Sequence, residues 1–200
     1  MKREDKNAQT RQNILDAALK EFSTKGYEKA SLNTICQTGS MSKGIIYHYF
    51  DSKDGLYLAV VEEAFRRLTD YLKSSINESS DNLLDQYFEA RVSFFRAHKD
   101  DAAVVFDATV LPPEQLINET NEKRQSFDAL NDAYLIRIIR ANKVRPDLTE
   151  DEILRVFHQF NQFFHAGYRN QGRSAPDIKA HEKDCQNALD IFFYGIIERK

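Results

Sequence analysis

Hydrophobic residues recur along most of the chain with the spacing of α-helices. Between Thr10 and Lys25, Ile14, Ala18 and Phe22 follow one another at intervals of four, which places them on one helical face. Gly26 then offers the permissive backbone with which helices often end. After Leu72, helical patterns alternate with short breaks and none has the pattern of a strand. The pattern predicts an all-α protein.

Two short helices are predicted to meet at Gly39 and Ser40. Ser31 can cap the first helix and Ser42 the second, since a serine hydroxyl accepts a hydrogen bond from a free backbone N–H at a helix start. Asp51 or Ser52 can cap a long fourth helix. Two helices joined by a tight turn form a helix-turn-helix, whose second helix can lie in the major groove of DNA. This stretch indicates a DNA-binding protein rather than an enzyme.

The same pattern separates an inward from an outward face. The residues expected to be buried are Leu32, Ile35, Cys36, Met41, Ile46 and Phe50. On the outward face, Lys43 can reach guanine O6 and N7 or a phosphate. Gly44 allows the backbone to approach the groove, and Ile45, which has no hydrogen-bonding side-chain atom, suits a thymine methyl group. His48 can contact a base or a phosphate, in a pH-sensitive way.

Composition and charge narrow the class further. The chain has 200 residues and only two cysteines, Cys36 and Cys185, which do not indicate a disulfide framework. No apolar run approaches the ~20 residues of a membrane span, and the start lacks a signal-peptide core. Residues 1–53 carry a net charge of +3 and the remainder −6. A basic end on an acidic body suits contact with phosphates at one end only, and we expect a soluble, cytoplasmic protein.

Residues from about Thr10 to Val61 resemble the TetR family of bacterial transcriptional repressors. The resemblance is strongest in the stretch SKGIIYHYFDSKDGL, which begins at Ser42. The chain departs from the family pattern in two places. It has Gly39-Ser40-Met41 where the family usually has Ala-Gly-Val, so Ser40 must take the conformation that glycine usually supplies. It also has Ile45 where the family often has threonine, which bears on specificity.

The resemblance adds roles to several of these residues. It implies that Tyr47 and Tyr49 contact phosphate oxygens, and that Lys53 binds the DNA backbone at the start of the fourth helix. Residues at the front of the second helix complete the expected set. The expected DNA-binding residues are Ser31, Asn33, Ser42, Lys43, Gly44, Ile45, Tyr47, His48, Tyr49 and Lys53. A simpler reading stays open, in which the tyrosines are the half-buried side of a packed helix and His48 is a solvated residue.

The rest of the chain is predicted to be a helical body. We expect a DNA-binding domain over residues 1–53, a connecting helix over 53–74, and a ligand-binding and dimerisation domain over 75–200. Pro112 and Pro113 enforce a break in the body. The helices expected there cover residues 82–98, 101–110, 114–143, 150–170 and 180–199.

Two of these helices are rich in aromatic residues. A helix that is apolar over most of its circumference must be covered on two sides, and a second subunit is a natural cover. The resemblance implies a four-helix dimer interface built from the last two helices, and two-fold dimers suit palindromic DNA sites. The expected interface residues are Phe157, Phe163, Tyr168, Leu189, Phe192, Phe193 and Ile196.

A small effector that binds within the body and loosens DNA binding is a further implication of the resemblance. The candidate pocket residues are Tyr87, Phe88, Arg91, Phe95, Phe106, Phe127, Tyr134, Phe160 and Phe164. Aromatic residues at helical spacing also form ordinary cores, so this reading stays open beside the first. His158 and His165 lie seven residues apart without an acidic or cysteine partner four residues on, so no metal is expected, and no cofactor either.

The sequence therefore predicts a dimeric repressor that binds a palindromic operator and is released by a small apolar or aromatic effector. One alternative is a constitutive DNA-binding regulator with a purely structural body. Another is an enzyme with an incidental helix-turn-helix. The chain shows no glycine-rich phosphate loop, nucleophile elbow or metal-binding helix motif, which disfavours an enzyme.

Overall fold

The computed structural model describes residues 3–77, 82–170 and 178–196, and for residues 3–4, 168–170, 178 and 194–196 it describes the backbone alone. The described residues are mostly helical and contain no β-strand, which confirms the all-α prediction. None of their helices is long and apolar enough to cross a membrane. Contacts divide the chain into two compact units: residues 1–65 with 98–124, and residues 66–97 with 125–200.

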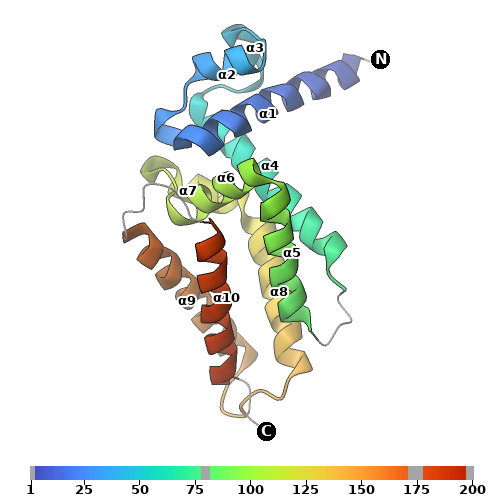
Figure 1. Ribbon diagram of the computed structural model, residues 1–200, viewed down its shortest axis with the longest axis vertical. Helices are drawn as coiled ribbons and strands as arrows, with labels where there is room; N and C mark the ends of the chain where they lie inside the picture. Colours follow the sequence, from blue (N-terminus) through green and yellow to red (C-terminus); the bar gives the residue numbers. More distant parts are fainter. Residues whose placement is uncertain (1–2, 78–81, 171–177, 197–200) are drawn as a thin grey trace. The chain divides into compact units, whose positions relative to one another are not determined.

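The first unit combines the N-terminal helices with a segment from the middle of the chain. Its helices are α1 (Arg3–Lys29), α2 (Leu32–Thr38), α3 (Lys43–Tyr49), the first part of α4 (Lys53–Ser75), α6 (Lys99–Val110), the short 3-10 turn η1 (Glu114–Leu116) and α7 (Ile117–Lys123). Figure 1 shows α2 and α3 beside α1. The core of the unit includes Ile14, Phe22 and Leu56, each at most 1% exposed.

Helix α1 differs from the prediction at its start, because it begins seven residues before Thr10. At Gly26 the regular helix is interrupted as predicted, since Gly26 has a non-helical backbone with φ 67° and ψ 173°. Only glycine takes such a conformation without strain. Beyond this kink a short helical segment runs to Lys29. Helix α6 packs along α1, and the Ser23 hydroxyl donates a 2.8 Å hydrogen bond to Asp100 Oδ1.

Asp107 on α6 is a carboxylate inside this unit. A Cβ atom at Gly26 would lie 3.9 Å from Asp107 Oδ2, and burial raises the pKa of Asp107 to about 6. A raised folded-state pKa means that the carboxyl stabilises the fold most below its unfolded pKa and loses this contribution as the pH rises through 6. We expect Asp107→Asn to raise the free energy of unfolding by about 1 to 2 kcal/mol at pH 8 and by almost nothing at pH 4. Urea titrations at both pH values measure this, with exposed Asp100→Asn as the control.

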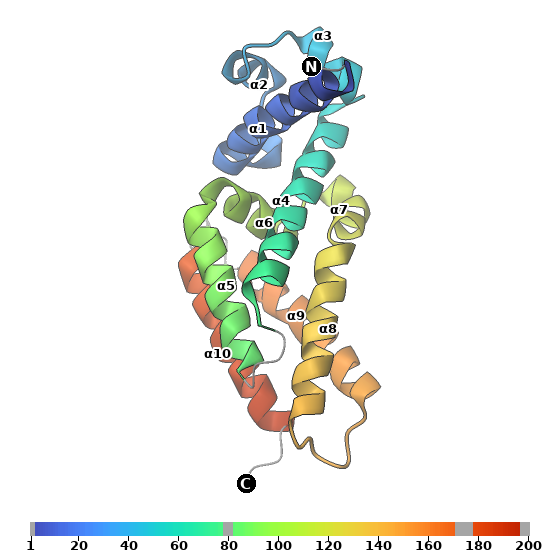
Figure 2. The ribbon, with the colours of Figure 1, turned by 90° about the vertical axis from the view of Figure 1, so that its right-hand side faces the viewer.

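The second unit contains the later part of α4, α5 (Leu83–Ala97), α8 (Gln125–Ala141), α9 (Glu150–Asn170) and α10 (Ile178–Ile196). Figure 2 shows α5 alongside α10. The single helix predicted over residues 114–143 is wrong. The chain leaves the helical path at Arg124, whose backbone N–H turns to Glu122 O, so that η1 and α7 belong to the first unit and α8 to the second. The Arg124 guanidinium lies 5.6 Å from the centre of the Phe65 ring.

Candidate functional site

The turn between α2 and α3 has the predicted caps and an unusual backbone. Ser31 Oγ accepts a 3.2 Å hydrogen bond from Asn33 N, and Ser42 Oγ accepts one of 3.4 Å from Ile45 N. Ser40 has φ 51°, so a serine does take the left-handed conformation that glycine usually supplies. Gly39 is needed for close packing instead, because a Cβ there would meet Met41 and lie 3.3 Å from Ile35 O.

Ser40→Gly is expected to stabilise the protein by about 0.5 to 1 kcal/mol, because it removes the cost of a left-handed backbone at a residue with a Cβ atom. Thermal unfolding followed by circular dichroism measures the gain. Ser42→Gly is the matched control, since Ser42 has an ordinary extended backbone and its hydroxyl caps α3. A lower melting temperature for Ser40→Gly would contradict the argument from strain.

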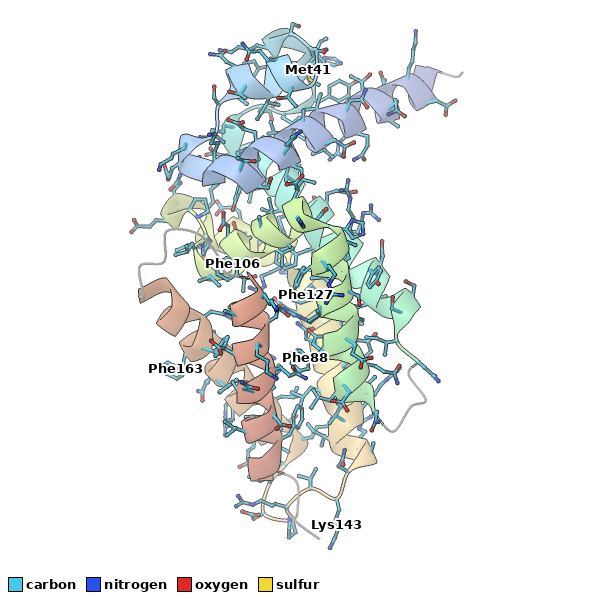
Figure 3. The ribbon with its side chains drawn as sticks, in the orientation of Figure 1. Met41, Phe88, Phe106, Phe127, Lys143 and Phe163 are labelled. Atoms are coloured by element: carbon cyan, nitrogen blue, oxygen red, sulfur yellow. The ribbon has the colours of Figure 1, made fainter. Side chains whose placement is uncertain are left out.

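Helix α3 divides into buried and exposed faces as predicted. Ile46 and Phe50 are 1% and 7% exposed, whereas Ile45 and Tyr47 are 40% and 50% exposed. Lys43, Gly44 and His48 are also exposed. Of the other residues expected to be buried, Ile35 is fully buried, and Leu32, Cys36 and Met41 are half-buried. Figure 3 labels Met41 at the junction of the short helices. The exposed face therefore carries a cation, an aliphatic group, a phenol and an imidazole.

Tyr49 differs from Tyr47 because it contacts α1. It is half-buried, and its hydroxyl donates a 3.3 Å hydrogen bond to Asn7 Oδ1. The ring of His48 meets it edge-on, with centroids 5.2 Å apart. Asn7 was missed from the sequence because the apolar pattern of α1 becomes visible only from Thr10. The front of α1 thus borders the exposed face of α3.

Lys53 stands at the start of α4, where the resemblance places it. Its Nζ donates a 3.3 Å hydrogen bond to Glu28 O and lies 4.6 Å from the centre of the Tyr27 ring. Ser52 is the cap, because its Oγ accepts a 3.0 Å hydrogen bond from Gly55 N. A helix start and an ammonium group together form an electropositive position suited to an anion. Ser31 is half-buried and Asn33 exposed at the front of α2.

The candidate pocket residues fall into both units. Phe106 lies in the first unit and the other eight in the second. Tyr87, Phe88, Phe95, Phe127 and Tyr134 are buried, and Phe160 and Phe164 are half-buried. Figure 3 shows Phe88 and Phe127 among the helices of the second unit. The structure therefore does not gather all nine residues in one compact unit.

Arg91 is the centre of a buried polar cluster in the second unit. Its Nε and Nη2 each donate a 2.8 Å hydrogen bond to the Glu182 carboxylate, and its Nη1 donates one of 2.9 Å to Tyr87 Oη. The two charged side chains are 12% and 6% exposed. Burial opposes ionisation of Glu182, but Arg91 and the neighbouring His181 outweigh it and lower the pKa of Glu182 to about 2.

Further groups extend this cluster. His181 Nδ1 lies 3.3 Å from Glu182 Oε1, and His181 Nε2 lies 3.5 Å from His165 Nδ1. Burial raises the pKa of Cys185 to about 11. Glu182 and His181 were missed from the sequence, although one signal was present: both precede Cys185 and Leu189 on the apolar side of α10. Within the described ranges, no group of three or more His, Cys, Asp or Glu side chains could hold a metal ion.

The residues expected at the dimer interface differ in how exposed they are. Phe157, Leu189 and Phe193 are buried inside the protomer, at 9%, 6% and 5% exposure. The half-buried Phe192 ring packs against the Phe157 ring, with the two ring centres 5.9 Å apart. The side chains of Tyr168 and Ile196 lie outside the described residues.

A different set forms the exposed apolar surface of α9 and α10. Phe163 is 77% exposed, Ile191 73% and Val156 47%. Val156 and Phe163 lie seven residues apart on α9 and so share one helical face. Figure 3 shows Phe163 pointing away from the helices. We call Val156 and Phe163 the exposed apolar face of α9, and Ile191 is a further exposed apolar residue on α10.

Comparisons with known proteins agree with the geometry of the short helices. Residues 14–60 match the family model described as bacterial regulatory proteins, tetR family. The chain is 40% identical over 65 residues to the HTH-type transcriptional repressor Rv1474c of Mycobacterium tuberculosis, a match that spans 32% of this chain and 35% of that repressor.

Two further matches span most of the chain. The HTH-type negative regulator IcaR of the biofilm operon icaADBC in Staphylococcus epidermidis is 22% identical over 180 residues, which cover 90% of this chain and 96% of IcaR. The fold is also similar to that of the transcriptional regulator FadR from Bacillus subtilis, solved in complex with stearoyl-CoA. The TM-score is 0.66 at 17% identity, over 89% of this chain and 96% of FadR.

Proposed function

The chain belongs to the tetR family of bacterial regulatory proteins, and from that premise we propose that it is a homodimeric repressor. It binds a palindromic DNA operator through α3 and releases the operator when a small effector binds the helical body. Residues 1–53 form the DNA-binding domain in this proposal. The observation that carries it is the exposed face of α3, where Lys43, Ile45 and Tyr47 point away from a core sealed by Ile46 and Phe50.

Lys43, Ile45 and Tyr47 on the exposed face of α3 each have a chemical role in the proposal. Lys43 reaches guanine acceptors or a phosphate, and Ile45 contacts a thymine methyl group. Tyr47 donates its hydroxyl to a phosphate oxygen, which positions the helix in the groove. Tyr49 shares its hydroxyl with Asn7, so α1 and α3 meet the DNA backbone together. Lys53 and the start of α4 bind an adjacent phosphate.

Selection from random duplex DNA yields an operator, and gel-shift titration then tests the contacts. We expect Lys43→Ala and Tyr47→Ala to weaken binding by about 10- to 100-fold, because a good base or phosphate contact is worth roughly 1 to 3 kcal/mol. Lys143→Ala is the matched control, since Lys143 is an exposed lysine of the second unit (Figure 3). Operator binding should also weaken steeply with salt. Full affinity in both α3 variants, or no dependence on salt, would refute the interface.

The exposed apolar face supports the homodimer. Val156 and Phe163 on α9 and Ile191 on α10 expose large apolar groups, and burying them against a second copy removes them from water. A two-fold dimer presents two copies of α3, which suits the two half-sites of a palindrome.

An effector that binds the body is supported by the buried aromatic residues of the second unit and by the ligand-bound structure of FadR. An effector lowers operator affinity only if it binds the DNA-free state more tightly than the DNA-bound state. Addition of an effector should therefore raise the melting temperature and weaken the gel shift together. A rise in melting temperature that leaves the gel shift unchanged would favour a constitutive regulator.

A further inference from the structure

The Arg91–Glu182 ion pair joins two helices whose residues are 91 positions apart in the chain. The guanidinium of Arg91 lies 5.5, 5.4 and 5.7 Å from the ring centres of Tyr87, Phe95 and Phe127. Three of its five N–H groups donate within the cluster: Nε and Nη2, on one edge, donate to the Glu182 carboxylate, and Nη1 donates to Tyr87 Oη. The Tyr87 hydroxyl itself donates a 2.7 Å hydrogen bond to Asn131 Oδ1. A cation in an aromatic enclosure with a planar carboxylate on its open edge is a complete carboxylate-binding arrangement.

Such a pair adds little to stability. Removing two charges from water costs about as much as their attraction returns, and apolar residues of similar volume often serve a core equally well. The second unit already has an aromatic core in which an apolar side chain could replace Arg91. The placement of a cation there is therefore explained better by ligand binding than by packing.

We propose that Arg91 is the anchor for the carboxylate of an apolar monocarboxylate effector, and that Glu182 is an internal carboxylate that the effector replaces. This inference rests on the proposed function. The effector's carboxylate takes the bidentate position on Nε and Nη2 that Glu182 holds, and its aliphatic or aromatic part lies against the surrounding rings.

The charges around Arg91 must stay balanced when the effector replaces Glu182. The Arg91–Glu182 pair holds one cation and one anion, so a second anion leaves one negative charge in excess. Glu182 contacts His181 at 3.3 Å, and His181 contacts His165 on α9 at 3.5 Å. One proton enters with the effector's carboxylate, so that the cluster gains no net charge, and the Glu182 side chain turns from Arg91 toward His181 Nδ1. No covalent bond breaks.

The same balance favours a monocarboxylate over a phosphate. A planar carboxylate replaces a planar carboxylate on one edge of the guanidinium, at the cost of one proton. A phosphate dianion would need a second proton. The other groups that face the pair are Tyr87 on α5 and Cys185 on α10, and burial raises the pKa of both, so neither adds a charge near neutral pH.

Melting temperatures with matched probes test the exchange. The probes are 3-phenylpropanoate and hexanoate, each paired with its primary amide, which has the same shape without the charge. We expect both acids to raise the melting temperature of the wild-type protein and the amides to leave it unchanged. The shift should be larger at pH 6 than at pH 8, because binding of the acid takes up one proton. Arg91→Met should abolish it.

Glu182→Ala is the positive control, because it leaves Arg91 without its internal carboxylate and should bind the acids more tightly than wild type. Acids that stabilise Glu182→Ala but not wild type would show that Glu182 is a permanent partner and would overturn the proposal. Equal shifts with acids and amides, or no shift with any protein, would overturn it as well. If a variant does not fold, the acid–amide and pH comparisons on wild type decide alone.

These measurements contain no DNA, so they are independent of the repressor proposal. If an acid binds but the gel shift is unchanged, the carboxylate site is supported and its role as the effector site is refuted. If the operator binds normally and no acid raises the melting temperature, the repressor proposal is supported and the carboxylate site is refuted.

Discussion

Replacing Phe163 by Asp is expected to convert the protein from a dimer to a monomer and to weaken operator binding by roughly 100-fold, since central aromatic anchors of an interface contribute about 2 to 4 kcal/mol each. Phe163 is 77% exposed and lies on the same face of α9 as Val156. A two-fold interface uses this face twice, so one substitution places two buried charges at the centre. Sedimentation velocity at micromolar concentration and gel-shift titration measure the two effects.

Val92→Asp is the matched control for this experiment. Val92 is 40% exposed on α5, so the substitution adds the same charge to an exposed valine outside the exposed apolar face. The control should stay dimeric and bind the operator normally. If Phe163→Asp remained a dimer, the interface would have to lie elsewhere on the chain, whereas a wild-type monomer would refute the homodimer altogether.

The second large effect concerns Arg91 and Glu182. We expect Glu182→Gln to lower the free energy of unfolding by about 3 to 5 kcal/mol at pH 7, because it leaves the Arg91 cation buried without a charged partner. Urea denaturation measures the loss. In contrast, the double variant Arg91→Met, Glu182→Leu should be nearly as stable as wild type, because it removes both charges and keeps the volume. A double variant as unstable as the single one would show that the hydrogen-bond network, and not the unpaired charge, carries the effect.

The pH dependence of this loss has a definite sign. Glu182 has a folded-state pKa of about 2, below its ordinary value of 4.5, so its contribution is complete above pH 4.5 and is lost as the pH falls toward 2. The difference between wild type and Glu182→Gln should therefore shrink in acid. Asp107 behaves in the opposite way, because burial raises its pKa and its substitution matters most at high pH.

The short helices could be predicted in detail because their determinants are local. The determinants all act within one or two helical turns. They are the serine caps, the buried residues spaced four positions apart, and the glycine of the turn. The positive φ of Ser40 follows from the same local pattern, since some residue of the turn has to adopt it. The outward direction of Lys43 and Tyr47 is fixed once Ile46 and Phe50 are buried.

The helical body could be predicted only in outline, because its contacts join distant residues. An aromatic helix shows that two of its sides are covered, but not which side meets the protomer's own core. Phe157 packs inward and Val156, one position earlier, stays exposed. Glu182 lies on α10 within apolar positions, and nothing nearby in the sequence identifies Arg91 as its partner.

Helix α6 packs against α1 within the first compact unit, although 69 residues of chain separate Lys29 from Lys99. During synthesis, α1 therefore leaves the ribosome long before the helix that covers it, and its apolar face waits until residue 124 has been made. A chimera that transfers only the first 53 residues to another body would leave that face open. A transplant intended to retarget a sensor to this operator should carry residues 98–124 with it.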